Sequence, residues 1–210
     1  MFKKKHIFGH LPHKRNKLFK ISLYTLIFLF FTYSFSCIIF HQISLDKNLR
    51  AYQKLDNFTP DLIAVFTGHS GRIPLALKMA QKYPQARIFI TGVNRNNTLE
   101  KLLEPFDLEL RPKLMDIDYW ARNTVENGIS TIRMLRKNPT LKNVLIISHD
   151  YHLMRINLIM DKLNAGNEDY KINFIGRETN YSNLRNLKIL SKEIIKLIRT
   201  HLLFLFWSPS

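Results

Sequence analysis

The sequence is poor in cysteine and glycine, and both shortages exclude classes of protein. Cys37 is the single cysteine among 210 residues, so no disulfide can form within the chain, and cysteine usage does not reveal the redox compartment. The seven glycines form neither a dinucleotide-binding fingerprint nor a P-loop, which argues against nicotinamide redox chemistry and nucleoside triphosphate hydrolysis. Ser70 also lacks the G-x-S-x-G spacing of a hydrolase nucleophile.

Acidic residues are missing from the first part of the chain. Residues 1–20 carry seven Lys and Arg side chains and no acid, and residues 21–45 carry no Asp, Glu, Lys or Arg. The remainder holds 25 of the 32 basic residues and all 16 acidic ones, so the net charge of +16 overstates its basic character. This smaller excess suits an anionic ligand or membrane surface. Because no nucleic-acid-binding motif accompanies it, we expect no nucleic-acid partner.

A long apolar segment follows the basic tail. Residues 21–40 read ISLYTLIFLFFTYSFSCIIF, and at about 1.5 Å per residue they span the roughly 30 Å core of a bilayer. A signal peptide cleaved after Ser36 would leave three large apolar residues on the mature end, and a lipoprotein signal ending at Cys37 would need a small residue in place of Phe35. We therefore predict an uncleaved transmembrane anchor.

Charge asymmetry predicts the orientation of this anchor. The tail before it is strongly basic, and the segment after it is nearly balanced, so the positive-inside rule places the N-terminus in the cytoplasm. We expect a single-pass protein of the inner (plasma) membrane with a periplasmic or otherwise extracytoplasmic domain. The predicted parts are a tail (1–20), an anchor (21–43), a linker (44–59), an α/β domain (60–183) and a C-terminal amphipathic helix (184–210).

The remaining sequence alternates short apolar runs with helical periodicity. Strands are predicted at 62–66, 87–91, 143–148 and 171–175, with a weaker one at 108–114, and helices at 73–83, 97–103, 124–137 and 151–164. Continuous apolar strands alternating with helices indicate a Rossmann-like, doubly wound α/β fold with a mostly parallel sheet. Ligands of such folds bind beyond the carboxyl ends of the strands.

The last helix admits two interpretations. Lys188, Lys192, Lys196 and Arg199 share one face, with apolar residues mostly opposite. The helix either packs on the sheet or brings its apolar end, residues 202–207, into the membrane interface beside the anchor.

Four segments in this order resemble the YdcF-like family of SanA/ElyC-type bacterial envelope proteins. They are Thr67-Gly68 with Arg72-Ile73 and Ala76-Leu77; Ile90-Thr91-Gly92-Val93-Asn94; Asp116-Ile117-Asp118-Tyr119 leading to Ala121-Arg122-Asn123-Thr124 and Asn127; and Ser148 with Tyr151-His152-Leu153-Met154-Arg155. The resemblance covers residues 60–165. It implies a Rossmann-like domain, commonly behind a membrane anchor, with a role in envelope (cell wall) biogenesis.

Several motif positions are candidate site residues. Arg72 and Arg155 follow strand ends near helix N-termini, where a guanidinium and free N–H groups favour a phosphate or carboxylate, although surface positions or internal salt bridges would also explain these arginines. His152 is a candidate acid or base, or a helix-capping residue. Glu126 is a second candidate, although Asn123 and Glu126 also match a capping box. The predicted ligand-binding residues are Gly68, Arg72, Asn94, Asn123, Asn127, Ser148 and Arg155.

A metal site is a further alternative. His149, Asp150, His152 and His69 carry the side chains that metals prefer. His149 and Asp150 stand where the family often has Thr-Ser, so the resemblance implies no metal, and the sequence indicates no cofactor.

The expected function is binding, and possible turnover, of an anionic phosphorylated envelope precursor such as a polyprenyl-phosphate-linked metabolite. An enzyme of this kind would be a transferase or hydrolase. The alternatives are a non-catalytic binding or regulatory module of envelope assembly and, if the topology is reversed, a cytoplasmic nucleotide binder.

Overall fold

The computed structural model describes residues 14–68, 70–106, 114–165 and 170–206, and the chain divides into two units, Met1–Ile39 and Phe40–Ser210. One helix, α1 (Lys14–Lys54), contributes to both. Within the described side chains of α1, Phe40 is the first that is buried. The boundary between the units therefore coincides with the point where the helix begins to bury side chains.

The part of α1 in the first unit is apolar and exposed. Among the described residues, α1 is the one helix that is long and apolar enough to cross a membrane. The hydroxyls of Thr25, Thr32 and Ser36 donate to main-chain carbonyls one turn earlier, so these polar groups are paired inside the helix. The predicted apolar helix is confirmed and supports a single-pass membrane protein.

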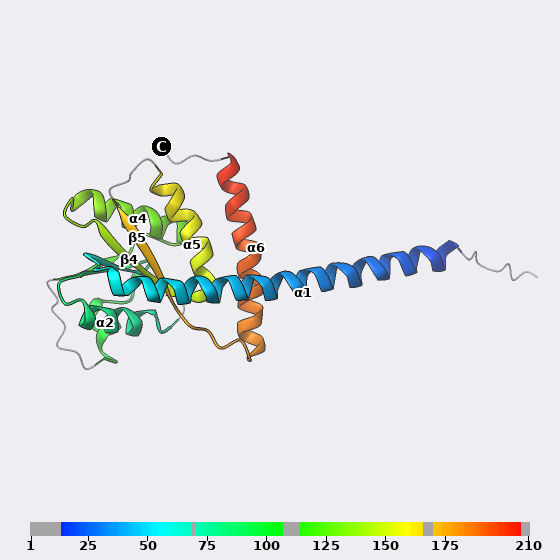
Figure 1. Ribbon diagram of the computed structural model, residues 1–210, viewed down its shortest axis with the longest axis horizontal. Helices are drawn as coiled ribbons and strands as arrows, with labels where there is room; N and C mark the ends of the chain where they lie inside the picture. Colours follow the sequence, from blue (N-terminus) through cyan, green and yellow to red (C-terminus); the bar gives the residue numbers. More distant parts are fainter. Residues whose placement is uncertain (1–13, 69, 107–113, 166–169, 207–210) are drawn as a thin grey trace, which may run out of the picture. The chain divides into compact units, whose positions relative to one another are not determined.

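The second unit is built on a sheet of five parallel strands in the described residues (Figure 1). The strands are β1 (Leu62–Phe66), β2 (Arg87–Thr91), β3 (Met115–Asp118), β4 (Asn143–His149) and β5 (Lys171–Arg177). Their spatial order is β3-β2-β1-β4-β5, with Val65 paired to Ile90 on one side and to Ile147 on the other. The doubly wound prediction is confirmed, since the order reverses between β1 and β4.

Helices cover both faces of this sheet. They are α2 (Arg72–Lys82), α3 (Leu99–Leu103), α4 (Thr124–Lys137) and α5 (Asp150–Leu163), whereas α6 (Leu184–Phe206) packs against α5. Ile63, Val65 and Ile147 pack with α2 and the end of α1, whereas Leu62, Ala64 and Ile146 pack with α4 and α5. Because both faces are covered, the strands are apolar at successive positions, and β1 is buried along its whole length.

The third strand differs from its predicted position. The weak prediction at 108–114 falls mostly outside the described residues, and the strand is found at Met115–Asp118. Its four residues are all half-buried, and two are aspartates. An edge strand with little apolar character gives a weak sequence signal, which explains the displacement.

The segment predicted as a linker is helical over most of its length. Residues 44–54 continue α1, and a short 3-10 turn, η1 (Leu55–Asn57), follows. Ser44 and Asn48 are buried although they are polar, because Ser44 Oγ donates to the Asp150 carbonyl and Asn48 bonds the main chain of Gly176. These two side chains attach α1 to the start of α5 and to β5.

The Asn48 side chain pairs with main-chain groups at the edge of the sheet. Its Nδ2 donates to the Gly176 carbonyl at 3.0 Å, and its Oδ1 accepts from the Gly176 N–H at 2.7 Å. Strand β5 is at the end of the strand order, so these main-chain groups face away from β4. The side-chain amide thus takes the place of a neighbouring strand.

We expect Asn48→Ala to lower the free energy of unfolding by about 2 kcal/mol, because it leaves the buried Gly176 N–H without a partner and the Gly176 carbonyl with only the longer bond from the Tyr52 hydroxyl, at 3.4 Å. Denaturant unfolding of the full chain in detergent, followed by tryptophan fluorescence, measures this loss. Arg50→Ala on the same helix is the control, since its exposed ion pair with Asp46 contributes little. Equal effects of the two substitutions would contradict the assignment.

Candidate functional site

The candidate site lies at the carboxyl ends of β1 and β4, where the strand order reverses. Residues 67–71 lead from β1 into α2, whereas β4 passes into α5 with no intervening loop. The first turn of α2 therefore brings Arg72 to this edge, and the start of α5 brings His152 and Arg155.

Arg72 is 4% exposed and is held by neutral groups. Its Nη1 donates to the carbonyls of Phe66 and Thr67, and its Nε donates to His149 Nδ1 at 2.7 Å. Burial lowers the pKa of Arg72, and a hydrogen bond with Tyr151 partly opposes this effect. In the described part of the chain, Arg72 forms no ion pair with an acid. The guanidinium is thus a buried cation without a direct counter-charge.

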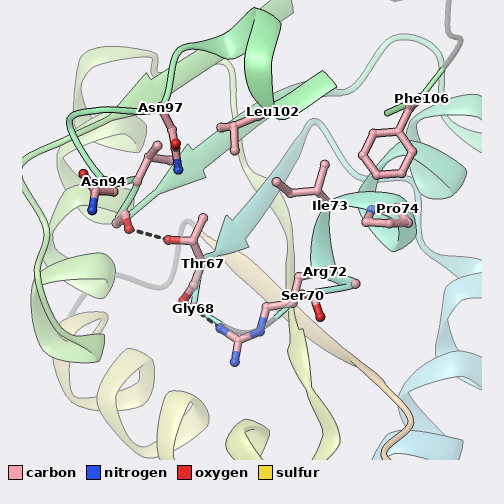
Figure 2. Close-up of a pocket in the computed structure, with 13 residues that line it drawn as sticks. Thr67, Gly68, Ser70, Arg72, Ile73, Pro74, Asn94, Asn97, Leu102 and Phe106 are labelled. Carbon is pink, nitrogen blue, oxygen red and sulfur yellow. Dashed lines mark hydrogen bonds between the residues drawn. The ribbon is translucent and has the colours of Figure 1, made fainter. Parts of the chain in front are cut away.

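A pocket of about 530 Å³ lies beside Arg72 (Figure 2). Polar groups from Thr67, Ser70, Arg72, Asn94 and Asn97 line it, together with the apolar residues Ile73, Pro74, Val93, Leu102 and Phe106. Figure 2 shows Asn94 and Asn97 on one side and Pro74 and Phe106 on the other. The pocket can therefore hold a ligand with a polar, anionic part and an apolar part.

The glycines of this edge have a steric role. Gly68, Gly71 and Gly92 all have positive φ angles, of 144°, 95° and 76°. A Cβ at position 92 would also lie 2.6 Å from Asn127 Oδ1 and 3.0 Å from Thr67 Oγ1. Gly92 thus lets β1, β2 and α4 approach closely at the floor of the pocket.

Helix α2 offers free main-chain donors at the pocket. Gly71 is its N-cap, and no side chain of the described residues caps the first turn. The N–H groups at this end have no partner within the helix, and they carry the positive end of the helix dipole. Together with Arg72, they make this corner of the pocket attractive to an anion.

A second cluster is buried between α4, α5 and α6. Glu193 Oε1 accepts from His152 Nδ1 at 2.6 Å and from Arg155 Nε at 2.5 Å. Arg155 Nη1 donates to Thr124 Oγ1 at 2.8 Å, and this hydroxyl lies 3.3 Å from His152 Nε2. The four side chains, which we call the Glu193 cluster, form a closed ring of hydrogen bonds.

Burial decides the protonation states in the Glu193 cluster. It lowers the pKa of His152 to about 4, against the opposing effect of Glu193. Burial alone would raise the pKa of Glu193, but the His152 hydrogen bond and the charges of His152 and Arg155 lower it to about 2. At neutral pH the ring therefore contains a neutral imidazole with its proton on Nδ1, a carboxylate and a guanidinium.

His149 and His152 carry their protons on different ring nitrogens. His149 Nδ1 accepts from Arg72, which places the proton of a neutral ring on Nε2, whereas His152 carries its proton on Nδ1. The residues that the structure describes contain no group of three or more His, Cys, Asp or Glu side chains placed to hold a metal ion. His69, the other candidate ligand, lies outside those residues.

Asn123 and Glu126 form the capping arrangement that the sequence offered as an alternative. Asn123 Oδ1 accepts from the Glu126 N–H at 3.0 Å, and Asn123 Nδ2 donates to Glu126 Oε1 at 2.8 Å. Glu126 Oε2 also accepts from the Arg122 N–H at 2.7 Å. Both side chains are thus engaged in starting α4, and neither lines the pocket described above.

The other predicted site residues are divided between the two groups. Gly68, Arg72 and Asn94 line the pocket, whereas His152 and Arg155 belong to the Glu193 cluster. Asn127 is buried, with Oδ1 3.3 Å from Thr91 Oγ1 at the end of β2. Ser148 is fully buried at the end of β4, and its hydroxyl has no hydrogen-bond partner in the described part.

Glu193 is a site residue that the sequence reasoning missed, and Asp118 is a half-buried carboxylate at the same edge of the sheet. Asp118 accepts from Thr91 Oγ1 at 2.8 Å; burial would raise its pKa, but side-chain and main-chain hydrogen bonds lower it. Glu193 is the only acid in α6 and is three residues after Leu190, on the buried face. The available signal in the sequence was an acid at an apolar position of an otherwise basic helix.

The arrangement thus offers an anion-binding pocket and, separately, a buried histidine whose proton position is fixed. Tyr151 lies between them, with its ring stacked 5.2 Å from His149 and 6.4 Å from the His152 ring. No protein-family model matches the chain, and no curated protein matches it.

Proposed function

We propose that this chain is a membrane-anchored, YdcF-like α/β protein of bacterial envelope biogenesis whose pocket binds a phosphorylated envelope precursor. The observation that carries this proposal is the buried Arg72, a cation without a paired acid beside the uncapped start of α2. A phosphate there would receive charge-assisted hydrogen bonds and supply the missing counter-charge. The apolar side of the pocket suits the hydrocarbon part of a lipid-linked ligand.

The membrane helix supports a lipid-linked ligand in this proposal. An anchored domain meets its ligand in or beside the bilayer, where polyprenyl-phosphate-linked precursors reside. The basic N-terminal tail favours a cytoplasmic N-terminus and an extracytoplasmic domain. A reporter fused after Ser210 tests this orientation, because activity of a cytoplasm-specific reporter would require the opposite topology and a different ligand.

The lining of the pocket favours binding of the ligand without turnover. Among the described lining residues there is no Asp, Glu or His. His152 and Glu126, the candidate acid and base, are both engaged in hydrogen bonds away from that lining. A binding or regulatory module therefore fits the described geometry better than a transferase or hydrolase.

Phosphorus NMR of the full chain in detergent, mixed with short-chain polyprenyl phosphate, its diphosphate and a sugar-linked diphosphate, distinguishes these forms. Broadened or shifted resonances without new ones are expected for a binding module. New resonances that are absent with His152→Gln would instead establish an enzyme. Unchanged spectra with all three ligands would contradict the proposal.

Arg72→Gln is expected to weaken binding of the responding phosphate ligand by about 10- to 100-fold, since hydrogen bonds to charged groups are worth about 1.5–3 kcal/mol. Arg72→Lys keeps the charge but loses the planar fork, and should fall between this variant and the native chain. Arg95→Gln, an exposed arginine in the loop after β2, is the control. Equal affinity of folded Arg72→Gln and native chains would rule out Arg72 as the anion contact.

A further inference from the structure

Helix α6 leaves a row of apolar side chains exposed. Leu187, Ile195, Ile198, Leu202 and Leu205 are 44% to 65% exposed, and we call them the α6 apolar row. Their spacing of eight, three, four and three residues places them on one face, because a helix has 3.6 residues per turn. Of the buried residues of α6, Leu190 and Glu193 belong to a different face, and Ile194 lies at the border between that face and the row. The row is thus additional to the face that holds α6 in the fold.

Basic residues lie beside this row. Lys188, Lys192 and Arg199 are exposed and are one to four positions from members of the row, and Arg185 and Lys196 extend the basic side. Glu193 is the only acid in α6, and it is 2% exposed. The solvent-facing surface of α6 therefore combines apolar side chains with an excess of positive charge, although Lys196 pairs with Glu193 at 3.4 Å.

We propose that the α6 apolar row docks on an anionic lipid surface, with Lys188, Lys192 and Arg199 at the phosphate headgroups. An exposed apolar face bordered by Lys and Arg is the pattern of helices that lie in the membrane interface. Five Lys and Arg residues exclude a membrane-spanning role for α6. The apolar helix of α1 tethers this unit to a bilayer, which raises the effective concentration of lipid near α6.

A second copy of the chain fits this surface less well. Two α6 helices meeting along their apolar rows would bring basic residues of both copies together, with no exposed acid on either helix. Anionic headgroups have the opposite charge and suit the same surface. Charge complementarity therefore selects lipid as the occupant.

Docking would connect the membrane to the interior of the domain. The exposed side of α6 would contact lipid, while Glu193 on its buried side holds His152 and Arg155. The same rigid helix thus fixes both the orientation of the domain at the bilayer and the Glu193 cluster.

The test uses the full chain with Cys37→Ser and Leu202→Cys, labelled at position 202 with a polarity-sensitive fluorophore. The protein is reconstituted in phosphatidylcholine vesicles with and without phosphatidylglycerol, and a lipid-borne nitroxide is the quencher. We expect quenching that strengthens with phosphatidylglycerol. Neutralising Lys188, Lys192 and Arg199 to glutamine should lower the docked-to-undocked ratio about fivefold for each residue.

The same label at Lys137→Cys, an exposed residue of α4, is the control and should be quenched little. Absence of quenching at position 202, equal quenching at 137, or no response to the glutamine substitutions would each overturn the proposal. A label at 202 that is shielded from water but not quenched, together with cross-links between two chains along α6, would assign the row to a second copy instead. Ligand binding at Arg72 is a separate readout that these surface variants should leave unchanged.

Discussion

Glu193→Ala is expected to lower the free energy of unfolding by about 3–5 kcal/mol, the usual loss when one partner of a buried ion pair is removed. Glu193 is 2% exposed and accepts hydrogen bonds from both His152 and Arg155. Without its carboxylate, the largely buried guanidinium of Arg155 loses its counter-charge, and the His152 N–H loses its acceptor. Denaturant unfolding of the full chain in detergent measures this loss.

Two further variants separate the charge of Glu193 from its packing. Glu193→Gln keeps an oxygen acceptor and the side-chain volume but removes the charge, so its loss should be smaller than that of Glu193→Ala. Glu178→Ala removes an exposed glutamate near the start of α6 and should change stability little. If Glu193→Ala were as mild as Glu178→Ala, the Glu193 cluster would not exist as described.

The free energy of unfolding is expected to fall by up to about 3 kcal/mol as the pH is lowered from about 6.5 to 4, because His152 binds a proton more readily in the unfolded chain than in the folded one. Burial lowers its pKa to about 4, whereas in the unfolded chain it titrates near its ordinary value of 6.5. Between these values the unfolded state binds the proton and the folded state does not, so acid favours unfolding. The stabilisation from the neutral histidine is complete above pH 6.5 and disappears through the folded pKa.

Glu193 adds a second acid-labile contribution at lower pH. Its folded pKa of about 2 is below the ordinary value of 4.5, so its stabilisation is complete above 4.5 and disappears as the pH falls toward 2. The interval from pH 6.5 to 4.5 therefore isolates the effect of His152 from that of Glu193.

Unfolding free energies of the native chain and of His152→Gln across this interval provide the measurement. The native chain should lose stability on acidification, and the variant should have a smaller slope. NMR of ring-labelled histidine should show His152 neutral, with its proton on Nδ1, down to about pH 4. Parallel slopes, or an imidazolium signal from His152 at pH 6, would contradict this account of its burial.

Local sequence patterns were sufficient to predict the central strands and helix α4. Strands β1, β2 and β4 are continuous apolar runs, and α4 begins at the predicted Asn123 cap. Strand β3 has a weak sequence signal, since it is at an edge and contains two aspartates, and the strand predicted at 108–114 falls mostly outside the described residues. The sequence does not show that residues 44–54 are attached to the domain, because partners such as Asp150 and Gly176 are more than 100 positions away.

The predicted site residues follow strand ends at one edge of the sheet, but the sequence could not divide them between the pocket and the interior. Arg72 and Arg155 resemble each other as arginines that follow strand ends, yet Arg72 lines the pocket without an acid, whereas Arg155 is neutralised by Glu193. That difference depends on an acid 38 positions after Arg155, and no local pattern contains it.

The sequence by itself determined the apolar helix, the α/β alternation and the edge at which polar residues gather, because each depends on periodicity or composition over short stretches. Only the tertiary structure decided which cation lacks a counter-charge, which ring nitrogen of His152 carries the proton and which face of α6 is left uncovered. These properties depend on burial and on contacts between distant segments. Burial changes the free energy of a charge by several kcal/mol, whereas the local sequence around that charge stays the same.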